Sequence, residues 1–116
     1  MTFPDDANGD ALRRLQRDGD DLTRARDIDF TVVFHDASAA EAFANHFRRL
    51  DHEASVEETH TKPELPWDVV IVNRMVPSHV GITEFENLLQ SVATGFGGRN
   101  DGWGCFAESV SATPGK

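Results

Sequence analysis

Hydrophobic residues alternate with polar ones over residues 28–34, where Ile28, Phe30 and Val32 would point to one side. This period of two is typical of a strand with one buried face. Residues 67–73 contain four consecutive branched aliphatic side chains and predict a central strand covered on both faces. A weaker strand is expected within residues 51–59 and a short last strand at residues 103–106.

Apolar residues at steps of three and four predict two long helices, one over residues 37–50 and one from Ser78 to the glycine pair that begins at Gly97. A short helix capped by Asp10 and stopped at Gly19 precedes the first strand. Without it, the element order is strand, helix, strand, strand, helix, strand. That order predicts an α+β fold, a ferredoxin-like sandwich in which two helices cover one face of an antiparallel βαββαβ sheet.

The 116 residues are enough for one hydrophobic core. We expect a single domain at residues 10–106, between a flexible lead-in at residues 1–9 and a flexible tail at residues 107–116. The first residues lack the basic and apolar regions of a signal peptide, and no apolar run is long enough to span a bilayer, so a cytoplasmic location is expected.

Charge narrows the choice of partner. Eleven Lys and Arg against twenty Asp and Glu give a net charge of −9. Direct binding to nucleic acid or to an anionic membrane is therefore not expected, because both need clustered cations. An acidic protein attracts basic partners. The single cysteine, Cys105, excludes an intrachain disulfide and is interpreted as a small buried apolar residue.

The sequence offers little for catalysis. The five histidines are scattered, so we expect no metal site, and no motif indicates a cofactor. His79, near the start of the second long helix, carries the alternative hypothesis of a small hydrolase-like enzyme that uses this imidazole and a neighbouring carboxylate on an acyl or phosphoryl substrate. The competing interpretation is a solvent-facing residue of the first helical turn, because no nucleophile lies nearby in sequence.

Negative charge is concentrated between residues 51 and 68, a segment that contains six acidic residues and one lysine. The spacing places Asp51, Glu53 and Glu57 on the strand face opposite Ala54 and Val56. These carboxylates either recruit a basic protein segment or form a solvated face that protects an edge strand. The charged candidates for protein binding are Asp51, Glu53, Glu57 and Glu58.

Residues 98–104 (GRNDGWG) form the second candidate feature. Their Asn-Asp-Gly step favours a sharp turn. Trp103, bracketed by two glycines, is either a core anchor beside that turn or, together with Asp101, an exposed protein-binding site. A further alternative is a structural domain that self-associates as a homodimer through the open sheet face, where we expect Thr31, Val33, Val70 and Val72.

Four segments together resemble the regulator of ribonuclease E activity B family: residues 27–34 (DIDFTVVF), the alanine-rich helix at 37–50, residues 67–70 (WDVV) and residues 98–104. The resemblance runs from about residue 10 to residue 106, and its most specific piece is Asn-Asp-Gly-Trp at 100–103. It implies a ferredoxin-like bacterial protein, without catalytic residues or cofactors, that inhibits an endoribonuclease.

The resemblance also implies a partner. Family members bind ribonuclease E outside its catalytic core, where a largely disordered scaffold carries arginine-rich stretches that bind RNA. An acidic module can compete with RNA for such cationic segments. Well-known members carry a long acidic C-terminal tail, whereas residues 107–116 contain one carboxylate side chain, Glu108. If such a tail contributes to inhibition in those members, this chain lacks that contribution.

Overall fold

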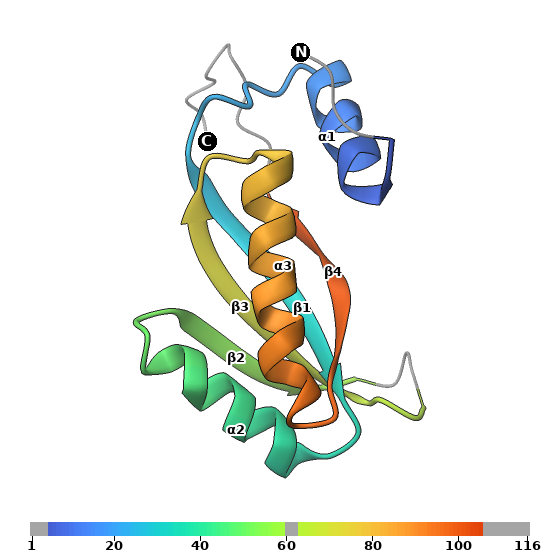
Figure 1. The fold of residues 1–116 in the computed structure, drawn as a ribbon, viewed down its shortest axis with the longest axis vertical. Helices are drawn as coiled ribbons and strands as arrows, with labels where there is room; N and C mark the ends of the chain where they lie inside the picture. Colours follow the sequence, from blue (N-terminus) through green and yellow to red (C-terminus); the bar gives the residue numbers. More distant parts are fainter. Residues whose placement is uncertain (1–4, 60–62, 106–116) are drawn as a thin grey trace.

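The computed structural model describes residues 5–59 and 63–105. Its elements, in chain order, are α1 (Ala7–Arg17), β1 (Arg26–Phe34), α2 (Ala37–Arg48), β2 (Glu53–Glu58), β3 (Trp67–Met75), α3 (His79–Thr94) and β4 (Arg99–Cys105) (Figure 1). The predicted tail at residues 107–116 lies outside the described residues, and so does Phe106 of the predicted last strand.

The four strands form one sheet in the order β2-β3-β1-β4, and every neighbouring pair is antiparallel. Helix α2 contacts β2 and β3, while α3 contacts β1 and β4, so the two helices cover one face (Figure 1). The ferredoxin-like α+β sandwich predicted from the element order is confirmed. The opposite face of the sheet is covered by none of the described helices, and we call it the open face.

The core lies between the sheet and the two helices. Alternation along β1 directs Ile28, Phe30, Val32 and Phe34 into it, and all four are fully buried. The Phe43 ring of α2 lies 5.0 Å from Phe34 and 5.1 Å from Phe47, measured between ring centroids. Tilted aromatic contacts of this kind add packing energy to the area that each ring buries.

Several details of the predicted strands and helices are wrong, including the last strand, which begins at Arg99 and includes the predicted turn. The β3 strand is central but is covered on one face only: Val69 and Ile71 are buried, whereas Val70 and Val72 are half-buried on the open face. In α2, the predicted apolar stripe stops before Leu50, which lies beyond the helix end and is 56% exposed.

Helix α1 begins earlier than predicted. Its cap is Asp6, whose side chain accepts a hydrogen bond from the backbone N–H of Gly9, and Asp10 lies in the first turn. Residues 7–9 therefore belong to the helix and not to the lead-in. None of the helices in the described part of the chain is long and apolar enough to cross a membrane.

A buried ion pair follows α1. The Arg26 guanidinium donates a 2.7 Å hydrogen bond to Asp20, and the two side chains are 2% and 1% exposed. Arg26 also donates to the backbone carbonyl oxygens of Asp21 and Arg24. The Asp20 carboxylate raises the pKa of Arg26 above its already high value. This cluster connects the segment after α1 to the first residue of β1.

Candidate functional site

Carboxylates line the β2 edge of the open face. Glu53, Ser55 and Glu57 are exposed, while Ala54 and Val56 between them are half-buried against the core. The predicted orientation of Glu53 and Glu57 is therefore confirmed.

The other two acidic candidates of this region do not share that orientation. Asp51 lies in the turn before β2, with a φ of 68°, and not in the strand. Glu58 ends β2 one position after Glu57, so the alternation of a strand directs it away from the open face.

Strand pairing extends the acidic surface across the sheet. Val72 of β3 lies opposite Glu53 of β2 on one side and opposite Asp29 of β1 on the other. Directly opposed residues in antiparallel strands point to the same face, so these three side chains lie side by side on the open face. Asp27 lies on the same face, two residues before Asp29. Sequence reasoning missed Asp27 and Asp29 as site residues.

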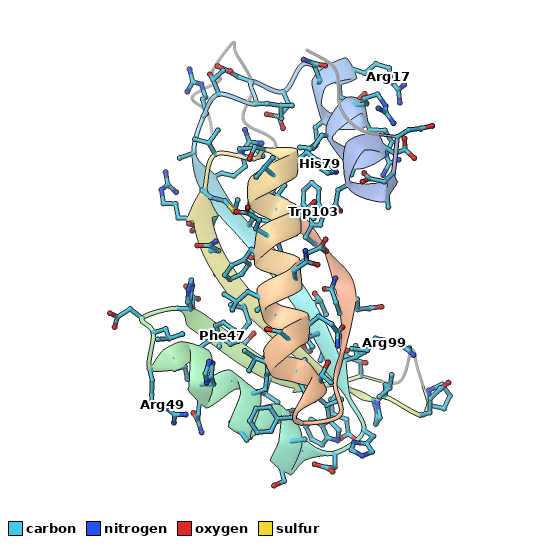
Figure 2. The ribbon with its side chains drawn as sticks, viewed as in Figure 1. Arg17, Phe47, Arg49, His79, Arg99 and Trp103 are labelled. Atoms are coloured by element: carbon cyan, nitrogen blue, oxygen red, sulfur yellow. The ribbon has the colours of Figure 1, made fainter. Side chains whose placement is uncertain are left out.

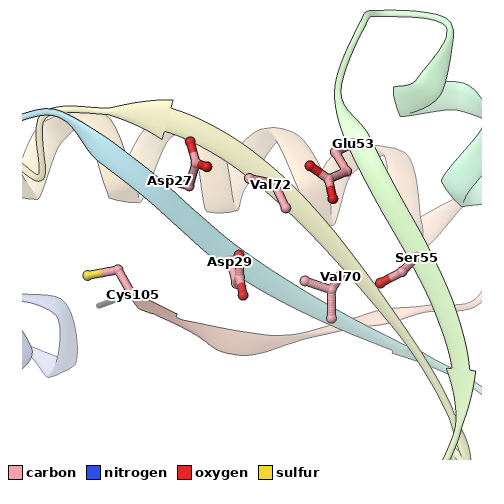
Figure 3. A pocket seen from close by; sticks show the side chains of 7 residues that line it. All are labelled: Asp27, Asp29, Glu53, Ser55, Val70, Val72 and Cys105. Carbon is pink, nitrogen blue, oxygen red and sulfur yellow. The ribbon is translucent and has the colours of Figure 1, made fainter. Parts of the chain in front are cut away.

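Two carboxylate rows follow from this pairing: Glu53 and Glu57 along β2, and Asp27 and Asp29 along β1. A shallow hollow of about 510 Å³ lies between them on the open face. It is lined by Asp27, Asp29, Glu53, Ser55, Val70, Val72 and Cys105. In Figure 3 the two valines of β3 lie between Glu53 and Ser55 of β2 on one side and the two aspartates of β1 on the other. An apolar floor with carboxylates on both sides suits a ligand that is itself apolar in the centre and cationic at its flanks.

Only part of the predicted dimer surface is accessible. By alternation Thr31, Val33, Val70 and Val72 all point to the open face, as predicted. Val33 is nevertheless fully buried, whereas the other three are half-buried. Self-association through this face remains a prediction.

Trp103 and Asp101 lie on β4, at the opposite edge of the sheet from β2. Trp103 pairs with Phe30 and so points to the helix-covered face. Its indole N–H donates a 2.9 Å hydrogen bond to Asn8 of α1 (Figure 2). Trp103 is half-buried against the core, while Asp101 is exposed. The structure thus separates these two candidates from the carboxylates of β2.

Trp103 belongs to a polar network that fastens α1 to the rest of the fold. The Asn8 side-chain amide donates to Thr83 at 3.1 Å and to Glu86 at 2.9 Å, both on α3. Glu86 also accepts a 3.0 Å hydrogen bond from Asn100 of β4. A second, smaller hollow of about 240 Å³ lies between α1 and β4. The network explains why Trp103 is a local anchor.

His79 occupies the first position of α3, and its Nε2 lies 2.9 Å from an Asp6 carboxylate oxygen (Figure 2). The backbone N–H of Gly9 and the His79 side chain together lower the pKa of Asp6. The carboxylate neighbour required by the hydrolase hypothesis is therefore present. Within the described residues, however, no hydrogen bond joins His79 to a hydroxyl or thiol, and the Ser78 hydroxyl caps α3 by accepting from the Gly81 N–H. The pair fastens α1 to α3.

The part of the chain that the structure describes offers few side chains for metal binding or thiol chemistry. There, no three His, Cys, Asp or Glu side chains come together in a way that could hold a metal ion. Cys105 pairs with Ile28 and packs against the core, but it is only half-buried and also lines both hollows, so it is not the buried apolar residue that was expected.

Comparison with known protein families identifies a family that the chain matches. Residues 5–105 match the family model described as Regulator of ribonuclease activity B. The match covers most of the chain and all seven helices and strands of the described residues. No curated protein matches the chain.

Proposed function

The chain belongs to the regulator of ribonuclease activity B family, and from this premise we propose that it inhibits a bacterial endoribonuclease of the ribonuclease E type in the cytoplasm. In this proposal the chain acts as a binding protein. Its carboxylates attract a basic segment outside the nuclease's catalytic core, and the bound segment is then no longer free to hold RNA.

The observation that carries the proposal is the exposed carboxylate pair on β2. Glu53 and Glu57 are both exposed and lie on the same side of the strand. Charges that only protect an edge strand need no apolar surface beside them. Here Glu53 borders a hollow whose floor is formed by Val70 and Val72. This combination supports a binding surface over a merely solvated strand.

Long-range attraction gives the mechanism a physical basis. The net charge of −9 repels RNA and attracts arginine-rich polypeptide, so the protein can compete with RNA without contacting it. Basic segments that bind RNA are commonly disordered and can adapt to a second partner. Inhibition should therefore require the basic region of the nuclease and should weaken as salt screens the charges.

The test compares nuclease activity and binding with and without charge reversal. We expect the parent protein to slow RNA cleavage by a full-length ribonuclease E but not by its isolated catalytic domain. Glu53→Lys combined with Glu57→Lys should weaken binding to the noncatalytic region by about tenfold or more at low salt, since two attractive pairs become repulsive. The loss should shrink between about 50 and about 300 mM salt as the Debye length falls.

The matched control reverses two exposed glutamates on the helix-covered side, Glu41→Lys with Glu84→Lys, which changes the net charge by the same amount. This control should retain most of the inhibition. Equal losses in both double variants would reduce the effect to net charge alone. Unchanged binding after reversal of Glu53 and Glu57, or inhibition of the isolated catalytic domain, would refute the proposal.

A further inference from the structure

We propose that the open face is a docking surface for one amphipathic cationic segment of the partner. The apolar side chains of that segment lie on Val70 and Val72, and its basic side chains pair with carboxylates on both sides, Glu53 of β2 and Asp29 of β1. This inference rests on the proposed function, and it adds the second carboxylate row and the apolar contact between the rows.

The arrangement follows from strand order and register. Val72 lies directly between Glu53 and Asp29, one strand from each. Strands are spaced about 4.8 Å apart, so the two carboxylate-bearing positions are about 10 Å apart across the valine. An α-helix with its side chains is about 10–12 Å wide. A helix with an apolar stripe can therefore contact the valines while basic residues beside the stripe reach both rows.

The exposure of the side chains agrees with such an occupant. Val70 and Val72 are only half-buried, so they retain apolar surface that a partner can cover. Asp29 and Glu53 are exposed, and neither forms an ion pair among the described residues. Asp27 differs, because the Arg74 guanidinium lies 3.4 Å from it. The strongest contribution is therefore expected from Asp29 and Glu53.

Charge decides against a second copy of this chain on the same surface. A twofold dimer would place the carboxylates of one open face against those of the other. Like charges brought together in an interface cost free energy, so the valines, together with Arg74 beside Asp27, would have to offset that repulsion. A cationic segment instead neutralises both rows. The same signs exclude an RNA ligand for this face.

The test uses two synthetic peptides of about 18 residues, five helical turns long. Both carry arginines at the same positions, and they differ only in the stripe, which is leucine in one and alanine in the other. Titration into the labelled protein should show the leucine peptide binding about tenfold more tightly, because apolar burial adds to the same charge attraction.

Variants then assign the contacts. Val70→Thr combined with Val72→Thr keeps branched side chains that suit a strand, and should remove most of the preference for leucine over alanine. Asp29→Asn and Glu53→Gln should each lower the affinity for both peptides by about threefold, as expected for the loss of one exposed charge pair. Glu84→Gln, on the helix-covered side, should change nothing. Circular dichroism and urea midpoints identify any variant that fails to fold, and Val70→Ala is then used instead.

Three results would overturn the inference. The first is equal affinity for the two peptides, and the second is a leucine preference that persists in the valine variants. The third is sedimentation that shows a dimer lost in those variants, which would assign the face to a second copy. If charge reversal on β2 still abolishes nuclease inhibition while the leucine preference is absent, the proposed function stands and only this docking surface fails.

Discussion

Replacing Gly98 by alanine should destabilise the fold by about 3 kcal/mol, near the upper end of the range for overpacking a filled core. A Cβ atom at this position would lie 2.6 Å from Cζ and 2.7 Å from Cδ2 of Phe34, and closer still to Cε2. Carbon atoms pack at about 3.5 Å or more, so the ring would have to move by more than about 1 Å. Phe34 is fully buried, and its ring packs against Phe43 at 5.0 Å, so it has no free space to enter.

The measurement is urea unfolding followed by tryptophan fluorescence, with Gly104→Ala as the matched control. No atom lies within 4 Å of a Cβ built at Gly104, so its replacement should change stability by less than about 0.5 kcal/mol. The double variant Gly98→Ala with Phe34→Leu tests the cause, because a smaller side chain should relieve the clash. A double-mutant cycle should therefore give a coupling of about 1 kcal/mol or more. Additive effects, or equal losses at Gly98 and Gly104, would refute the steric argument.

Two further predictions concern charged groups. The lowered pKa of Asp6 means that its contribution to stability is present above the ordinary value of 3.8 and is lost as the pH falls through the folded-state value, so the melting temperature should fall less below about pH 4 in Asp6→Asn than in the parent, measured by circular dichroism. An equal fall in both would contradict this. Asp20→Ala should cost about 3 kcal/mol in urea unfolding, because it leaves the Arg26 guanidinium buried without its carboxylate, whereas Asp20→Leu with Arg26→Met should recover most of the loss. Equal losses in the single and double variants would show that the charge is not the cause.

Most of the fold could be predicted because periodicity carries it. The alternation in β1 and the three- and four-residue steps in α2 depend only on which face is buried. The cap of α1 could not be fixed in this way, because Asp6 and Asp10 are the same residue type four positions apart. The prediction that β3 is covered on both faces was wrong for a related reason: a run of valines has no alternation, so it fits a strand buried on both faces as well as one with an open face, where the self-association hypothesis placed Val70.

The site was only half predictable, because a sequence shows the face of a side chain before it shows its neighbours across the sheet. Glu53 could be placed by alternation within its own strand. Its relation to Asp29 depends on the order β2-β3-β1, which places these two residues, 24 positions apart in sequence, on either side of Val72. The turn predicted at residues 100–102 was wrong, because these residues belong to β4. A register shift between Phe30 and Val32 lets Trp103 and Asn100 both pair with core-facing residues, which simple alternation along β4 does not allow.

The exposed carboxylates at the β2 edge lie apart from the arginines of α1. Helix α1 carries two exposed arginines, Arg14, which lines the hollow between α1 and β4, and Arg17 at the edge of the molecule (Figure 2). These cations reduce the total charge but lie away from β2, so they do not neutralise Glu53. A basic segment that approaches is therefore attracted more strongly to the carboxylates at the β2 edge than to the arginine-bearing side of α1, which helps to orient it before contact. In this molecule one face of the sheet packs against α2 and α3 to form the core, the other is covered by none of the described helices, and the proposed cationic partner would meet its carboxylates there.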